Sequence, residues 1–301
     1  MSSAPTLPEP AADPAPSPWL VPFDGSFRVD NASTAPPGGK RDKKAEKEDE
    51  RRLDELGEEL DGLQRRLYAE NSRALLLVFQ AMDAAGKDGV IRAVMHGVDP
   101  AGCEVTAFKQ PSSEELDHDF LWRAVRRLPE RGRIGIFNRS YYEEVLVVRV
   151  HPEYLGGQRL PGPVDPARLW EERFESIRQL ERHLARSGTA VVKFWLNVSA
   201  GEQKKRFLSR LDEPEKNWKF NEGDVAEAKH WDGYMAAYQA ALSATSRPWA
   251  PWYAVPADDK DFARRVVAEV IAETLRRMKP EFPAVSEERR RILARMREQL
   301  G

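Results

Sequence analysis

The sequence predicts an α/β fold in which helices cover both faces of a parallel five-stranded sheet. Three observations predict it. Short apolar runs alternate with longer segments of helical periodicity, which is the pattern of strands joined by crossover helices. Residues 75–79 are apolar throughout, as expected of a strand buried on both faces. The chain has 301 residues, 41% of them hydrophobic and 32% charged, which suffices for one large domain of this class.

Two segments precede the first strand. Residues 1–40 are rich in Pro, Ala, Ser and Gly, and we expect most of this arm to be mobile because it buries too little surface to offset its ordering entropy. The apolar residues within 18–29 are the part expected to dock onto the body. Residues 41–71 form an amphipathic helix with a leucine stripe, made of Leu53, Leu56, Leu60, Leu63 and Leu67. This stripe packs on the domain or, alternatively, pairs with another subunit.

The remaining elements follow in order. Strands are expected at residues 75–79, 103–108, 133–137, 191–198 and 252–255. Helices are expected from Gly86, over 112–128, from about Tyr141, over 166–187 and over 261–278. The domain therefore spans residues 41–279, and residues 280–301 form a further C-terminal helix. In such a sheet, ligands bind at the carboxyl ends of the strands.

The first strand runs directly into a small-residue loop and a helix that Gly86 and Lys87 open. This matches the P-loop pattern G-x-x-x-x-G-K-[ST] in part, with Ala81 at the first Gly and Asp88 replacing the hydroxyl residue. Free N–H groups and the positive end of the helix dipole make such a loop a phosphate seat. The seat consists of Ala84, Ala85, Gly86, Lys87, Asp88 and Gly89. An ordinary strand-to-helix turn is the alternative.

Polar and charged residues emerge abruptly from the third strand. Residues 134–144 read I-G-I-F-N-R-S-Y-Y-E-E and carry Asn138, Arg139, Glu143 and Glu144. Such groups are costly after an apolar strand unless they face a ligand or water. They are therefore candidates for a site, and a solvated strand end is the alternative.

A basic patch follows the fourth strand. It contains Lys204, Lys205, Arg206, Arg210, Lys216 and Lys219. Arg206 and Arg210 are four residues apart and share one helix face, so both can approach the same polyanion. A lid that closes over phosphates and excludes water is expected at about residues 199–224, because residues 212–224 have the Pro, Asn and Gly content that such a flap needs; a solvated helix face is the alternative.

Composition excludes several classes of protein. The formal net charge of −2 argues against general nucleic-acid or membrane binding. The sequence has no apolar run long enough to span a membrane and no secretory signal pattern. Its single cysteine excludes an internal disulfide. We therefore expect a cytoplasmic protein.

Together, the loop A-M-D-A-A-G-K-D-G, the strand end F-N-R-S-Y-Y-E-E, the segment F-K-Q-P-S and the region from K-K-R-F to K-N-W-K resemble the family-2 polyphosphate kinases. The resemblance covers about residues 23–278. It implies a P-loop kinase-like fold with a helical lid, and phosphoryl transfer between inorganic polyphosphate and nucleotides with Mg²⁺ or Mn²⁺.

The resemblance and the chemistry of the residues assign roles to this site. The catalytic residues are expected to be Asp83, Lys87, Asn138 and Arg139. Further phosphate contacts are expected from Lys109, Arg139, Arg206 and Arg210. A metal ion is expected at Asp83 with Glu143 or Glu144, because carboxylates together with substrate phosphates are the usual ligands of Mg²⁺.

The branch of the family that this chain most resembles has Asn at position 138, where many members have Asp, and acts on both AMP and ADP. The resemblance thus implies reversible conversion of AMP to ADP and of ADP to ATP, in a homodimer or homotetramer. Two alternatives remain: an ATP-dependent nucleotide kinase, and a nucleotide-binding switch without turnover.

Overall fold

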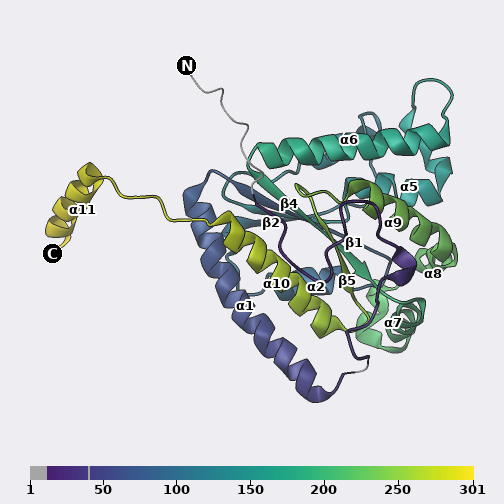
Figure 1. Cartoon of the computed structure of the whole chain (residues 1–301), viewed down its shortest axis with the longest axis horizontal. Helices are drawn as coiled ribbons and strands as arrows, with labels where there is room; N and C mark the ends of the chain where they lie inside the picture. The colour runs from purple at the N-terminus through teal and green to yellow at the C-terminus, as the bar shows by residue number, and fades with distance from the viewer. Residues whose placement is uncertain (1–11, 40) are drawn as a thin grey trace.

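The structure is a computed structural model that describes residues 12–39 and 41–301. Its centre is a five-stranded sheet in the order β2-β3-β1-β4-β5 (Figure 1). Every neighbouring pair in the sheet is parallel, as predicted. The strands are β1 (Ala74–Ala81), β2 (Cys103–Ala107), β3 (Ile134–Asn138), β4 (Thr189–Asn197) and β5 (Trp252–Pro256).

Helices of very different lengths connect the strands. The α-helices are α1 (Lys43–Glu70), α2 (Lys87–Val94), α3 (Ser113–Leu116), α4 (Trp122–Val125), α5 (Val147–Val150), α6 (Pro166–Arg186), α7 (Ala200–Asp212), α8 (Glu222–Glu227), α9 (Trp231–Thr245), α10 (Lys260–Met278) and α11 (Glu287–Leu300). The 3-10 helices are η1 (Val29–Asn31), η2 (Pro100–Gly102), η3 (Tyr141–Glu144), η4 (Pro152–Gln158), η5 (Pro214–Lys219) and η6 (Ala228–His230).

Helices cover both faces of the sheet. All residues of β1 are buried, and since side chains alternate between the faces of a strand, both faces must be covered there. On one side α10 packs against α1, α2, β4 and β5, and on the other α6 packs against β4 and α9. The leucine stripe of α1 faces the body: Leu56, Leu60 and Leu67 are buried, and the helix packs against α10. Packing on the domain is therefore confirmed for this stripe.

Residues 12–39 lie along the body, where the composition predicted a mostly mobile arm. The Val21 N–H donates to the Trp252 carbonyl oxygen at 2.9 Å, and the Ala254 N–H donates to the Trp19 carbonyl oxygen at 2.8 Å. The arm is ordered because β5 is an edge strand, whose free backbone groups can pair with an extended segment. The predicted docking of the apolar residues in this arm is confirmed. Residues 1–11 lie outside the described part of the chain.

Two predicted helices are broken. In place of one helix over 112–128, α3 and α4 are separated by a turn in which the Asp119 carboxylate accepts a hydrogen bond from the Leu121 N–H at 2.9 Å; such side-chain bonding competes with the helix. The helix predicted from Tyr141 is the 3-10 helix η3 followed by the short α5. Ser140 Oγ accepts from the Tyr142 N–H at 3.1 Å and tightens that turn.

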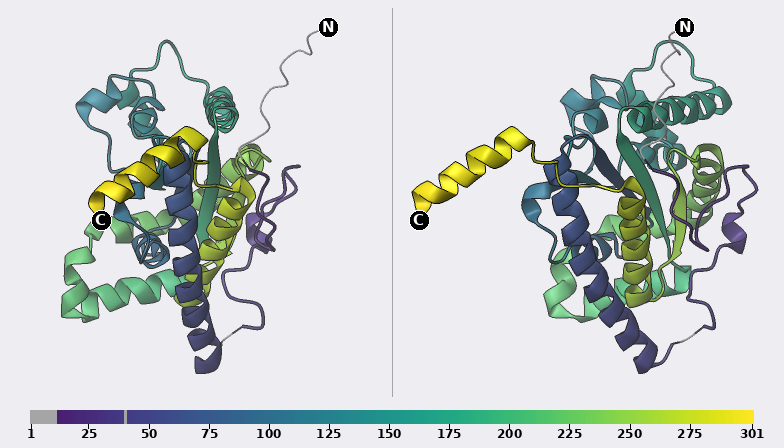
Figure 2. Two further views of the ribbon diagram at one scale, coloured as in Figure 1. Left: turned by 90° about the vertical axis from the view of Figure 1, so that its left-hand side faces the viewer. Right: turned by 60° about the vertical axis from the view of Figure 1, so that its left-hand side comes forward.

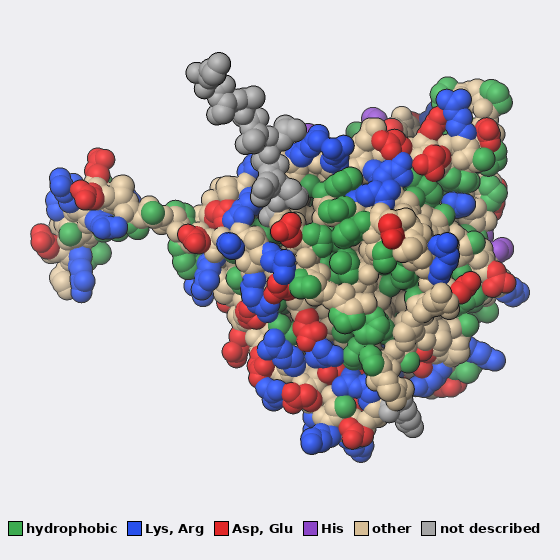
Figure 3. Space-filling model, in the orientation of Figure 1, with side chains coloured by type: hydrophobic (Ala, Val, Ile, Leu, Met, Phe, Trp, Pro, Cys, Tyr) green, Lys and Arg blue, Asp and Glu red, His purple; other side chains and the backbone are tan. Residues whose placement is uncertain are grey.

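The C-terminal helix α11 stands away from the rest of the chain in Figure 1 and in the right panel of Figure 2. On the face seen in Figure 3, positive and negative side chains are interspersed, in keeping with the small net charge of −2. Among the described residues, no helix is long and apolar enough to cross a membrane.

Candidate active site

The predicted phosphate loop and the polar end of the third strand meet at one edge of the sheet. β1 and β3 are neighbours in parallel register, with Phe79 opposite Asn138, so their carboxyl ends lie side by side. A cavity of about 470 Å³ opens there, between the phosphate loop, the end of β3, α7 and the start of α10. We call it the anion cavity. Ten Lys or Arg side chains and only two aspartates line it.

The phosphate loop has the backbone geometry of an anion site. Gly86 caps α2 with a φ of 101°, which glycine tolerates without strain. Ala84 has a φ of 60°, a conformation that costs a non-glycine residue about 1–3 kcal/mol. In the part of the chain that the structure describes, the N–H groups of residues 86–89 have no acceptor. These four donors at the start of a helix are the groups that bind phosphate.

Lys87 is buried beneath this loop. Its Nζ donates to the Ala81 carbonyl oxygen at 2.8 Å. Burial, and then the nearby positive charge of Arg139, lower the pKa of Lys87 from 10.5 to about 8. A bound phosphate would oppose both effects by supplying negative charge, so the ammonium form is stabilised when an anion is present.

Arg139 lies between two carboxylates. Its guanidinium donates to Asp83 Oδ1 at 2.6 Å and to Glu143 Oε2 at 2.9 Å. Glu143, with a smaller contribution from Asp83, raises the pKa of Arg139, so it stays charged at any working pH. Its φ of 62° is strained for this residue, as is common at functional sites. Next to it, Asn138 Nδ2 donates to Asp88 Oδ1 and ties the end of β3 to α2.

Glu144, one of the two alternative metal partners predicted for Asp83, has its own set of partners among the described residues. Its carboxylate accepts from Gln158 Nε2 at 2.6 Å and from Arg173 at 3.4 Å. Burial raises the pKa of Glu144, and Arg173 opposes that shift. The sequence pattern did not predict these contacts because η3 turns its two glutamates in different directions: Glu143 towards Arg139, and Glu144 towards α6.

Arg206 also differs from its prediction as a lid cation. It is buried, and its guanidinium donates to backbone carbonyl oxygens of Ala84, Ala85, Ala257 and Asp258. Arg210, one turn further along α7, fits the prediction better: it lines the anion cavity and pairs with Asp224 at 2.8 Å. Helical spacing predicted that both residues share one helix face. It could not show that the hydrogen-bond donors of Arg206 are occupied by the backbone, whereas Arg210 keeps donors for a ligand in the cavity.

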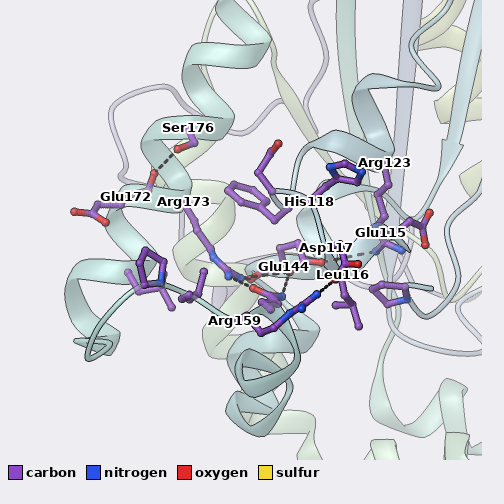
Figure 4. Close-up of a pocket in the computed structure, with 17 residues that line it drawn as sticks. Glu115, Leu116, Asp117, His118, Arg123, Glu144, Arg159, Glu172, Arg173 and Ser176 are labelled. Carbon is purple, nitrogen blue, oxygen red and sulfur yellow. Dashed lines mark hydrogen bonds and ion pairs between the residues drawn. The ribbon is translucent and has the colours of Figure 1, made fainter. Parts of the chain in front are cut away.

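Two further cavities continue from the anion cavity. A side cavity of about 610 Å³ shares Phe108, Lys109 and Arg139 with it. An outer cavity of about 660 Å³ in turn shares Arg123, Glu144 and Gln158 with the side cavity. Figure 4 shows the outer cavity, in which Arg173 of α6 reaches towards Glu144 and Arg159 lies beside Asp117. Lys109, which was predicted as a phosphate contact, therefore lies at the junction of the anion cavity and the side cavity.

Several lining residues were not predicted. Arg92, Lys260 and Arg264 extend the positive wall of the anion cavity, and Gln158 and Arg173 bind Glu144. They lie on helices far apart in sequence and belong to no local motif. Only the fold brings them together, so no sequence signal identified them.

The predicted metal ligands are distributed over the cavities. Asp83 lines the anion cavity, whereas Glu143 and Glu144 line the side cavity. Within the described residues, no group of three His, Cys, Asp or Glu side chains is arranged to hold a metal ion. Mg²⁺ is commonly held by one or two carboxylates together with substrate phosphates. Asp83 fits that mode.

Comparisons with known proteins agree with this geometry. The family model described as Polyphosphate kinase 2 (PPK2) matches residues 43–283. A crystal structure of Polyphosphate Kinase 2 from Arthrobacter aurescens TC1 is similar with a TM-score of 0.82 and 37% identity, over 95% of this chain and 99% of that one.

Two curated relatives are also similar. An ADP-polyphosphate phosphotransferase of Rhodopseudomonas palustris is 57% identical over 81% of this chain and 84% of its own length. An AMP/ADP-polyphosphate phosphotransferase of Meiothermus ruber is 43% identical over 76% of this chain and 81% of its own length.

The lowered pKa of Lys87 predicts how anion binding depends on pH. Since Lys87 loses its proton in the free protein as the pH rises through about 8, affinity for inorganic tripolyphosphate should fall above that pH and be constant well below it. Calorimetric titrations between pH 6.5 and 9.5 measure this. Lys87→Met should bind tripolyphosphate weakly at every pH, without this fall in affinity near pH 8, which we call the step.

Lys193 is the necessary control, because burial lowers its pKa to about 8 as well. Lys193→Met should keep the step in tripolyphosphate affinity. A step that persists in Lys87→Met, or vanishes in folded Lys193→Met, would contradict the assignment to Lys87.

Proposed function

The chain belongs to the polyphosphate kinase 2 family, and we propose that it transfers phosphoryl groups from inorganic polyphosphate to both AMP and ADP. The observation that carries this proposal is the anion cavity, where ten Lys or Arg side chains and two aspartates surround about 470 Å³. A single terminal phosphate does not need so many cations. A long polyanion does, since each of its phosphates carries charge to be neutralised.

The donor chain would lie on the N–H groups of residues 86–89 and continue past the cations that line the cavity. Two sets of these cations extend beyond the loop: Arg210, Lys216 and Lys219 from the lid, and Arg92, Lys260 and Arg264 from α2 and α10. Phosphoryl transfer needs in-line positioning and neutralisation of charge more than covalent help from the protein. The walls of the anion cavity are suited to both tasks.

The acceptor nucleotide would occupy the side cavity. This cavity is continuous with the anion cavity through Lys109 and Arg139, so these two cations would hold the acceptor phosphate. The nucleoside would extend towards Val147, Tyr154 and the buried group around Glu144. Arg139, held between Asp83 and Glu143, would then contact donor and acceptor at their meeting point.

We propose that Mg²⁺ or Mn²⁺ binds with Asp83 and the substrate phosphates, where it would neutralise negative charge on the transferring group. Asp83 is suited to this because it lines the anion cavity and, among the described residues, forms an ion pair with Arg139 alone. An acceptor phosphate near Arg139 would compete for that pair and leave the Asp83 carboxylate free for the metal. The homodimer or homotetramer and the cytoplasmic location stay predictions.

One assay separates the proposal from its alternatives. With Mg²⁺, polyphosphate and either AMP or ADP, the protein should form ADP and ATP, which chromatography of the products measures. A nucleotide kinase would instead form ADP from ATP and AMP and leave polyphosphate unused. A binding switch would bind nucleotide without any product. Either result would refute the proposed reaction.

Acceptor choice should depend on Asn138. Asn138→Asp would place a carboxylate against Asp88, whose Oδ1 now accepts from the Asn138 amide. Two like charges about 4 Å apart repel by roughly 4 kcal/mol at an effective dielectric constant near 20. The added charge should hinder an AMP phosphate that must approach closely, and reduce the rate with AMP more than the rate with ADP, as steady-state rates with each acceptor would measure.

The matched control exchanges the two groups. Asn138→Asp combined with Asp88→Asn keeps one carboxylate and one amide in contact, so the ratio of AMP to ADP rates should return towards that of the unchanged protein. A ratio that is the same in all three proteins would show that this pair does not set acceptor choice.

Glu144 should affect the nucleotide and not the metal. Because its carboxylate lies in the wall of the side cavity, Glu144→Gln should raise KM for ADP several-fold and leave KM for polyphosphate and the Mg²⁺ dependence unchanged. Glu172→Gln is the control, since Glu172 lines only the outer cavity and is exposed. A shift of the Mg²⁺ dependence in Glu144→Gln would restore the metal role predicted from the sequence.

A further inference from the structure

Two side chains of α7 hold the phosphate loop from behind. Gln203 Nε2 donates to the Asp83 carbonyl oxygen at 3.0 Å. Arg206 donates to the next two carbonyl oxygens, of Ala84 at 3.3 Å and of Ala85 at 2.7 Å. Three consecutive carbonyl groups of the loop are thus bound on the side of α7. We call these two side chains the carbonyl clamp.

We infer that Gln203 and Arg206 are positioning residues, which keep the carbonyl oxygens of residues 83–85 turned away from the anion cavity so that the N–H groups at the start of α2, beginning with that of Gly86, face the polyphosphate. The inference rests on the proposed function for the identity of the anion. It gives Arg206 a role different from the phosphate contact expected of a lid cation.

Arg206 has no donor left for a phosphate. A guanidinium has five N–H donors. Its Nε donates to Glu202 at 2.9 Å, and its terminal nitrogens donate to the Ala84 and Ala85 carbonyl oxygens of the loop. The remaining two bonds go to Ala257 at 2.6 Å and Asp258 at 3.1 Å. Five donors meet five acceptors, and the residue is 8% exposed.

The loop needs such support because its backbone is strained at Ala84, which has a φ of 60°. The peptides on either side of Ala84 can relax by rotating, which would exchange their N–H and carbonyl positions. A carbonyl oxygen directed into the anion cavity would then repel phosphate oxygens instead of binding them. Hydrogen bonds to the carbonyls of residues 83–85 favour the anion-binding orientation.

The clamp also ties the loop to the rest of the site. Arg206 joins the phosphate loop to the segment after β5 through Ala257 and Asp258, and Gln203 is buried at 3% exposure. Arg210, one turn further along α7, is bound instead to the lid residue Asp224. The first half of α7 thus shapes the loop, and its second half carries a cation that can exchange partners.

The experiment compares Gln203→Met, which keeps the length of the side chain but has no donor, with Arg206→Lys, which keeps the charge. We expect each variant to weaken the affinity for inorganic tripolyphosphate about tenfold, the size expected when a buried hydrogen bond is lost. With polyphosphate and ADP, kcat should fall and KM for polyphosphate should rise, while KM for ADP stays unchanged. Lys205→Met is the control, since its side chain is 78% exposed and, among the described residues, forms an ion pair with Glu202 alone; it should stay within twofold of the unchanged protein.

A double-mutant cycle distinguishes positioning from direct phosphate contact. If both residues hold one loop, their losses should not multiply, because the effects of groups that act as a unit are not additive. The double variant Gln203→Met with Arg206→Lys should then have an affinity for tripolyphosphate within about twofold of that of the single variant that binds less tightly. In the double variant Gln203→Met with Arg210→Met, the two losses of tripolyphosphate affinity should instead multiply, since Arg210 would contact the anion independently of the loop. Thermal unfolding confirms that each variant is folded.

Two results would overturn the inference: a folded Gln203→Met variant that binds tripolyphosphate within twofold of the unchanged protein, or losses that multiply in the Gln203–Arg206 cycle. If Arg206→Lys does not fold, Gln203→Met alone decides the question. Because binding is measured without turnover, failure of the proposed reaction would appear separately, as tripolyphosphate binding without ATP formation from polyphosphate and ADP.

Discussion

The anion cavity must hold many positive charges close together before any anion is bound. Two unit charges 4 Å apart repel by about 4 kcal/mol at an effective dielectric constant near 20, and ten Lys or Arg side chains line this cavity. The protein reduces the repulsion differently at each position. Arg139 lies between two carboxylates, and Arg210 pairs with Asp224. Burial lowers the pKa of Lys87 to about 8, which makes its neutral form easier to reach.

These partners differ in whether a substrate can replace them. An arriving polyphosphate competes with the carboxylates that hold Arg139 and Arg210, because phosphate oxygens offer the same charge and geometry. Arg206 pairs with Glu202 through Nε, but its two terminal nitrogens donate to neutral backbone carbonyls, two of them in the loop itself, so substrate gains little by displacing them. Arg139 and Arg210, whose terminal nitrogens pair with carboxylates, are therefore suited to binding, and Arg206 is suited to shaping the site.

The parts of this site that the sequence predicts are those formed by residues that are contiguous in the sequence. The apolar strand, the loop with Gly86 and Lys87 and the polar strand end at Asn138 are each contiguous, and the parallel sheet brings them together without further information. The contacts of Glu144 and Arg206 were not predicted, because they depend on which way a turn or a helix points its side chains, and the metal role expected of Glu144 stays a prediction. The ordered arm at residues 12–39 was missed because its stability comes from the free edge of β5, which composition does not reveal.

The turn that carries Arg139 is anchored in the core. The Tyr141 and Tyr142 hydroxyls donate to Glu181 at 3.0 and 2.9 Å, and Lys193 Nζ donates to the same carboxylate at 2.7 Å. Removing one partner of a buried ion pair costs about 3–5 kcal/mol, so this turn does not shift readily. In-line transfer needs one reactant fixed while the other is brought to it. The anchored end of β3 is suited to supply the fixed reference.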